Sequence, residues 1–107
     1  MFNLFSSDKA YKSLGGKEFK EEYTKSNQAA LIDVRTAGEF RSGTINNARN
    51  IDIMSPDFYN QISALDKRKV YFVFCQSGGR SGQACSIMAK QGFTVYNLKG
   101  GVSSWPR

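Results

Sequence analysis

Short apolar runs alternate along this chain with segments whose apolar residues recur at helical spacing. The apolar runs are the expected strands, and they lie at residues 29–34, 48–53, 69–74 and 93–98. The expected helices lie within residues 14–26, 36–43, 55–65 and 81–92, and a short final helix follows a turn within residues 99–105. Strands that alternate with helices favour a parallel sheet with helices on both faces. We therefore expect an α/β fold, in which ligands bind beyond the carboxyl ends of the strands.

Residues at the ends of the expected helices follow known capping preferences. Thr36, with Glu39 three residues later, has the pattern of a capping box. Ser55 is the expected N-cap of the next helix, with Pro56 in its first position. Gly92 is the expected end of the last long helix. These residues predict where the helices begin and end.

Length and composition limit the possible functions. We expect the chain of 107 residues to form one domain, residues 1–107, which is large enough for a core without disulfides or a structural metal. It has no histidine, which excludes imidazole bases and any Cys/His or Ser/His/Asp catalytic arrangement. Its two cysteines do not make the disulfide framework of a secreted protein. The first 14 residues lack the features of a signal peptide, and no segment has membrane-spanning length. We therefore expect a cytoplasmic protein without a membrane partner.

The net charge of +6 raises the question of nucleic-acid binding. Lysines and arginines are scattered along the chain, and the densest basic run is "DKRK" at residues 66–69. Interleaved charge of this kind is typical of a solvated surface, so we expect no nucleic-acid partner. A generally positive field does favour small anionic substrates.

The segment "VFCQSGGRSG" places Cys75 at the end of the strongest expected strand. Gly78 and Gly79 let successive backbone N–H groups point at one place. Ser81 is the expected N-cap of the following helix, whose N-terminus adds positive potential. Arg80 adds a fixed positive charge, either to this cradle or to a bound oxyanion. Such donors lower the pKa of a thiol, so we expect Cys75 to be a nucleophilic thiolate at neutral pH.

Two other interpretations of Cys75 have to be weighed. A cysteine after a strand is more often part of the core, and a strand–loop–helix turn needs glycines in any case. The combination of cysteine, glycines, arginine and serine in one short loop favours a functional cysteine. Only Gln76 to Gly79 separate Cys75 from Arg80, one residue fewer than in cysteine-dependent phosphatases. The smaller ring favours one extra sulfur atom, and hence a persulfide, over a phosphoryl group.

Three segments resemble the signatures of the single-domain rhodanese family of sulfurtransferases. They are the loop "CQSGGRS", the upstream segment "LIDVRTAGEFRSGTINNARNID" and the downstream segment "LKGGVSSW", which together span residues 31–105. The resemblance implies a rhodanese-like α/β fold with a parallel sheet of about five strands. It also implies that Cys75 carries sulfur as a persulfide, without a metal or organic cofactor. The loop residues expected to bind this sulfur are Gln76, Ser77, Gly78, Gly79, Arg80 and Ser81.

The implied activity is sulfur transfer in two steps. Cys75 takes a sulfane sulfur from a small anionic donor such as thiosulfate or a persulfide, and a thiophilic acceptor, cyanide or a thiol, then removes it. The acceptor thiol can belong to a partner protein. A second hypothesis is a relay module that passes persulfide sulfur between proteins without small-molecule turnover. A cysteine phosphatase or arsenate reductase is disfavoured by the loop length, and an inactive regulatory domain by the presence of Cys75.

Four positions depart from the family pattern. Gln76 and Gly79 stand where efficient thiosulfate sulfurtransferases often carry basic side chains, so we expect thiosulfate to be a weak donor. Thr44 replaces the usual histidine, and Asn47 replaces the usual glycine. Both lie outside the loop, so we expect them to affect local packing rather than chemistry.

The remaining notable residues are expected to be structural. For Asp33, Arg35 and Glu39, a network that fixes the strand end and the following helix is favoured over contact with substrate. Cys85 stands among apolar residues of the expected helix, which favours a buried structural thiol over a resolving cysteine. Trp105 is expected to be a core or lid aromatic. The adjacent glycines at positions 100 and 101 are expected to form a tight turn.

Overall fold

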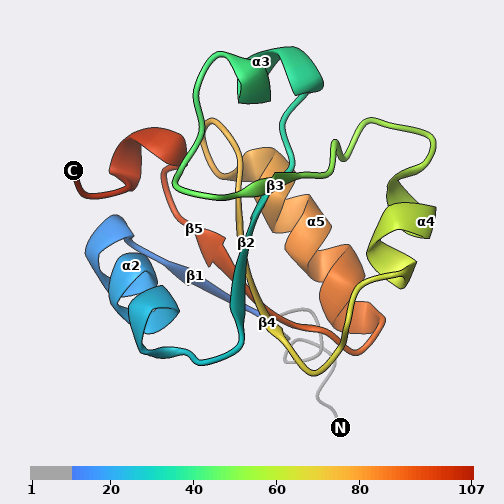
Figure 1. Ribbon diagram of the computed structural model, residues 1–107, viewed down its shortest axis with the longest axis horizontal. Coiled ribbons are helices and arrows are strands. Elements are labelled where there is room, and N and C mark those ends of the chain that lie inside the picture. Colours follow the sequence, from blue (N-terminus) through green and yellow to red (C-terminus); the bar gives the residue numbers. More distant parts are fainter. Residues whose placement is uncertain (1–10) are drawn as a thin grey trace, which may run out of the picture.

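The computed structural model describes residues 11–107. Its elements are β1 (Lys12–Leu14), α2 (Gly16–Lys25), β2 (Ala29–Asp33), α3 (Ala37–Arg41), β3 (Arg49–Asn50), α4 (Phe58–Ser63), β4 (Val70–Phe74), α5 (Gly79–Lys90), β5 (Thr94–Leu98) and the 3-10 helix η1 (Val102–Ser104). The five strands form one sheet in the order β1-β5-β4-β2-β3, and every neighbouring pair is parallel (Figure 1). The expected parallel α/β fold is therefore confirmed.

Apolar side chains pack on both faces of this sheet. On one face, α4 and α5 cover the sheet with Ile62, Cys85 and Met88 in the core. On the other face, α2 and the C-terminal segment cover it, and the ring of Phe19 packs edge to face on Phe72 at 5.3 Å between centroids. The helices thus lie on both faces, as expected (Figure 1). Because β4 is covered on both sides, its run of apolar residues is continuous rather than alternating.

The order of the strands brings the loops that follow β2 and β4 together at the carboxyl ends of the strands. β4 lies between β2 and β5, and Cys75 follows its last residue. Asp33, the last residue of β2, is in register with Phe74, and the Val34 amide donates to the Phe74 carbonyl at 3.0 Å. The segments that follow β2 and β4 therefore leave the sheet side by side. The Cys75 loop thus lies at the carboxyl ends of the strands.

Two predicted boundaries in the middle of the chain are wrong. α4 begins at Phe58 with Asp57 as its N-cap, rather than at Pro56 with Ser55 as its cap. The Ser55 hydroxyl instead accepts a hydrogen bond from the Asp57 amide at 3.1 Å, so its capping tendency is satisfied in a turn before the helix. The expected strand at residues 48–53 is reduced to β3, because the chain beyond it makes only separate hydrogen bonds to residues 33 and 34.

Other boundary signals are confirmed. Thr36 accepts a hydrogen bond from the Glu39 amide at 3.2 Å, and the Glu39 carboxylate accepts one from the Thr36 amide at 3.0 Å, which completes the capping box at α3. Gly92 follows the end of α5 with a positive φ of 95°.

The N-terminal part of the chain is described from residue 11 onward. The expectation that the first residues lack a signal peptide falls mainly on residues 1–10, outside the described residues. Among residues 11–107, no helix combines the length and the apolar character that crossing a membrane requires.

Candidate active site

The sulfur of Cys75 lies in a cradle of hydrogen-bond donors at the end of β4. The side chain is 1% exposed. The Gly78 amide donates to Sγ at 3.0 Å, and the Ser81 hydroxyl donates to Sγ at 3.3 Å. Cys75 thus faces the interior of its own loop, as the glycines of the loop predicted.

The cradle changes the acidity of this thiol. Burial of the sulfur acts to raise the pKa of Cys75, because it disfavours the charged form. Hydrogen bonds from the Ser81 hydroxyl and from loop amides act in the opposite direction and outweigh burial, so the net pKa lies below its ordinary value. The contributing amides are those of Ser77, Gly78 and Ser81. The expected stabilisation of a thiolate is therefore present in the geometry.

Ser81 fulfils a different role from the one predicted. α5 begins at Gly79, and its N-cap is Gly78, which has a left-handed φ of 104°. The helix starts early because glycine adopts this conformation without steric penalty. Ser81 consequently lies inside the first turn, where its buried hydroxyl contacts the sulfur instead of capping the helix. The prediction of Ser81 as N-cap is wrong, although its place in the loop is as expected.

The turn at residues 100–102 packs against the backbone of the Cys75 loop. Gly101 has a positive φ of 82°, and a Cβ at this position would collide with the Gln76 carbonyl and the Ser77 amide. The next residue, Val102, donates its amide to the Cys75 carbonyl at 2.9 Å. The tight turn expected at residues 100–101 is present, and it also fixes the backbone of the Cys75 loop. Sequence reasoning missed this second role, for which the adjacent glycines are the only signal.

Arg80 points to a carboxylate on α3. Its Nη1 donates to Glu39 Oε1 at 2.8 Å, and its Nη2 donates to Oε2 at 3.1 Å. The Arg80 guanidinium and the Thr36 amide lower the pKa of Glu39 to about 2. This bidentate contact connects the Cys75 loop to α3.

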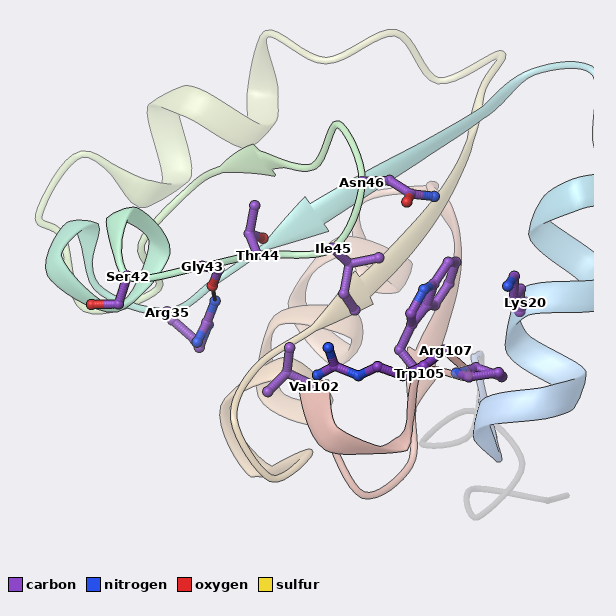
Figure 2. Close-up of a pocket in the computed structure, with 11 residues that line it drawn as sticks. Lys20, Arg35, Ser42, Gly43, Thr44, Ile45, Asn46, Val102, Trp105 and Arg107 are labelled. Carbon is purple, nitrogen blue, oxygen red and sulfur yellow. Dashed lines mark hydrogen bonds between the residues drawn. The ribbon is translucent and has the colours of Figure 1, made fainter.

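Arg35 is the other arginine beside the loop, and it is also paired. Its Nε and Nη2 donate to the Asp33 carboxylate at 2.9 and 2.8 Å, with both side chains almost completely buried. Nη2 also donates to the Gly43 carbonyl at 2.7 Å (Figure 2). Nη1 donates to Gln76 Oε1 at 3.3 Å, which connects this ion pair to the loop. The expected network of Asp33, Arg35 and Glu39 is therefore wrong in one member, since Glu39 binds Arg80.

Two further polar residues contact the Asp33–Arg35 ion pair and the Cys75 loop. Thr44 donates its hydroxyl to the Asp33 carboxylate at 2.9 Å, so the residue in place of the usual histidine helps to hold an ion pair. Asn97, at the end of β5, donates its amide nitrogen to Ser13 Oγ at 3.0 Å and to the Gly78 carbonyl at 3.4 Å. Sequence reasoning did not single out Asn97, because a lone asparagine in a strand carries no distinctive signal.

The second cysteine is a buried thiol. Cys85 is fully buried in α5, and burial together with the nearby Cys75 raises the pKa of its thiol above the ordinary range.

Trp105 packs edge to face on Phe19, with 6.2 Å between the ring centroids, against the core cluster under α2. In the described residues, the cysteine and carboxylate side chains form no group of three that could hold a metal ion.

The candidate site is thus a buried cysteine that follows the central strand of a parallel α/β sheet, with the Gly78 amide and the Ser81 hydroxyl donating to its sulfur. The chain belongs to the rhodanese-like domain family, whose model matches residues 16–107. The expected family and fold class are thus confirmed.

Individual relatives agree with this assignment. A sulfurtransferase of Allochromatium vinosum is 35% identical over 78 residues, which cover 72% of this chain and 71% of the relative. Thiosulfate sulfurtransferase GlpE of Stutzerimonas stutzeri is 37% identical over 79 residues, which cover 72% and 70%. The crystal structure of a rhodanese-like domain protein from Staphylococcus aureus superposes with a TM-score of 0.77 at 27% identity, covering 89% of this chain and 91% of that chain.

Proposed function

We propose that this protein is a sulfurtransferase that carries sulfane sulfur as a persulfide on Cys75. The observation that carries the proposal is the pair of donors on Sγ, the Gly78 amide and the Ser81 hydroxyl. They favour the thiolate form of Cys75, and the amides of the same loop are the proposed donors to a terminal sulfur atom. The relatives named as sulfurtransferases support the reaction class.

The reaction follows from the chemistry of a thiolate. In the first step, the Cys75 thiolate attacks the outer sulfur of the donor, a new S–S bond forms, and the donor's own S–S bond breaks. The donor leaves as a thiolate, or as sulfite when it is thiosulfate. In the second step, the acceptor attacks the terminal sulfur of the persulfide and takes it, and the Cys75 thiolate is regenerated. No external electrons are needed, since the sulfur is transferred as neutral sulfur: the leaving group keeps the electron pair of the broken S–S bond, and the attacking group supplies the pair of the new bond.

The loop chemistry supports an organic persulfide as a better donor than thiosulfate. Arg35 and Arg80 are both paired with carboxylates, and the two loop positions where basic side chains are common hold Gln76 and Gly79. A doubly charged inorganic donor therefore finds few free cations next to Cys75. A thiol, on a small molecule or on a protein, or cyanide is the proposed acceptor.

We propose that the protein works in a reducing compartment such as the cytoplasm, where its two cysteines stay free thiols. In this setting Cys75 stays available for persulfide formation.

Steady-state turnover tests this proposal. Purified protein is assayed for thiocyanate with cyanide as acceptor and either thiosulfate or glutathione persulfide as donor. We expect turnover with both donors, with the higher kcat/KM for the persulfide, and no turnover by the Cys75→Ser variant. A persulfide that forms on Cys75 but passes only to a protein thiol favours the relay module. Hydrolysis of a phosphate ester without sulfur transfer would refute the proposal in favour of a phosphatase.

A further inference from the structure

A cavity of about 650 Å³ is lined by residues that include Arg35 and Val102, both of which hydrogen-bond to the Cys75 loop. It opens between α2, residues 42–46 and the C-terminal residues (Figure 2). Cavities of this volume are typical of sites for small organic ligands. An inorganic sulfur anion would fill only a small part of this volume.

Two contacts connect this cavity to the loop. Arg35 lines the cavity and donates from Nη1 to Gln76 Oε1 at 3.3 Å. Val102 also lines the cavity, and its amide donates to the Cys75 carbonyl at 2.9 Å. A molecule in the cavity therefore contacts two residues that hydrogen-bond to the Cys75 loop, at the Gln76 side chain and at the Cys75 carbonyl.

The cavity supplies the unpaired cations that the loop lacks. The arginines that flank the loop, Arg35 and Arg80, are both paired with carboxylates. Lys20 and Arg107 line the cavity, and within residues 11–107 neither has a carboxylate at ion-pair distance. In that same part of the chain, no aspartate or glutamate lines the cavity. An anionic group that approaches the loop thus finds its unpaired counter-charges here.

An aromatic ring forms another wall of the cavity. Trp105 lines it, and Lys20 Nζ lies 5.4 Å from the centre of the indole ring. This cation–π contact helps to hold the ammonium at the edge of the cavity. An aromatic wall beside two cations suits a ligand with an organic body and an anionic end.

We propose that this cavity binds the anionic organic part of the sulfur-bearing substrate, a low-molecular-weight thiol or its persulfide that carries a carboxylate or phosphate group. The proposal rests on the proposed sulfurtransferase function and names the class of substrate. The loop then binds only the sulfur, while Lys20 and Arg107 bind the charge.

Trp105 is the only tryptophan of the chain, so its fluorescence reports on the cavity without any sulfur chemistry. Reduced glutathione serves as the carboxylate probe and reduced coenzyme A as the phosphate probe. We expect a saturable fluorescence change with at least one of them. The K20Q/R107Q double variant should bind that probe roughly fivefold more weakly, because two surface charge contacts are lost.

The matched control is the K69Q/K90Q double variant, which removes the same number of charges from exposed lysines outside the cavity. It should bind as tightly as the wild-type protein. If glutathione binds, its diethyl ester should bind as weakly as glutathione binds to K20Q/R107Q, because the ester has lost the carboxylate charges. Saturation by glutathione alone supports a carboxylate ligand, and saturation by coenzyme A alone supports a phosphate ligand.

Three results would overturn the cavity proposal: no saturable change with either probe, equal affinities in wild type and K20Q/R107Q, or equal weakening in both double variants. Mass spectrometry of Cys75 after persulfide treatment of the same preparations is the separate readout for the proposed function. A persulfide on Cys75 without a fluorescence response would remove the cavity proposal and leave the sulfurtransferase proposal in place.

Discussion

The carboxylate of Glu39 binds both terminal nitrogens of Arg80, at 2.8 and 3.1 Å, and so joins the Cys75 loop to α3. This bidentate geometry fixes the direction of the guanidinium as well as its position. It also balances the charge of Arg80 beside the loop. An incoming donor therefore does not meet Arg80 as an unpaired cation.

Removal of the Glu39 charge should change the donor preference. In Glu39→Gln the amide oxygen still can accept the Thr36 amide and cap α3, but Arg80 carries an unbalanced charge. We expect kcat/KM for thiosulfate to rise about threefold, with little change for a persulfide of lower charge. Steady-state thiocyanate formation measures both values. Glu22→Gln, which removes a carboxylate paired with Lys25 on α2, is the control. An unchanged ratio of the kcat/KM values for thiosulfate and for the persulfide would show that the ion pair does not set the donor preference.

The same ion pair should make stability depend on pH in acid. Folding lowers the pKa of Glu39 from 4.5 to about 2, chiefly through Arg80. A carboxyl group whose pKa is lowered by folding adds stability that is fully present above its unfolded pKa and is lost as the pH falls through the folded value. In urea denaturation, the free energy of unfolding of wild type should exceed that of Glu39→Gln near pH 5, and this difference should disappear as the pH falls to about 2. A difference that stays constant across this range contradicts the assignment.

The Ser81 hydroxyl should control the reactivity of Cys75. Ser81→Ala removes a donor to Sγ, so the pKa of Cys75 should rise. The rate of alkylation by iodoacetamide near neutral pH should then fall roughly tenfold, which corresponds to the loss of one hydrogen bond to a charged group. The pH profile of alkylation should shift to higher pH. Ser86→Ala, on the same helix but without a contact to the sulfur, should alkylate like wild type. Identical profiles for Ser81→Ala and wild type would exclude this role.

A side chain at Gly101 should disturb the Cys75 loop, because this glycine packs against the loop backbone. In Gly101→Ala the new methyl group collides with the loop backbone at Gln76 and Ser77, so we expect at least about a tenfold loss of kcat/KM. Gly92→Ala is the matched control, because it also has a positive φ, of 95°, but its nearest neighbours are the Lys67 side-chain atoms at 4.0 Å. This control should lose about 1 kcal/mol of stability and keep its turnover. Equal turnover in the two variants would contradict the support by Gly101.

The strands that carry the core were predictable because of their apolar runs. β2, β4 and β5 lie within the expected ranges, since each contains consecutive apolar residues that a covered parallel sheet requires. β1 could not be predicted from such a pattern, because only Leu14 of its three residues is buried. Its pairing with β5 depends on the assembled sheet rather than on local sequence. The start of α4 was misplaced because Ser55 fits a turn as well as a helix cap.

The cysteine loop was predictable because its residues form one continuous segment. The partner of Arg80 was not, because it lies 41 residues away in the sequence. Asp33 and Glu39 were both available to Arg35, and the choice between them depends on how α3 and α5 pack beside the sheet. The support from Gly101 and Asn97 was missed for the same reason, since each acts through a contact between distant segments.

Intact-mass spectrometry of the wild-type and Cys75→Ser proteins, after incubation with an organic persulfide, tests the central claim most directly. Thermal unfolding of both proteins first establishes that the variant is folded. We predict that the wild-type protein gains the mass of one sulfur atom, that cyanide removes it as thiocyanate, and that Cys75→Ser gains nothing. No adduct on the wild-type protein, or an equal adduct on the variant, would contradict the assignment of Cys75 as the sulfur carrier.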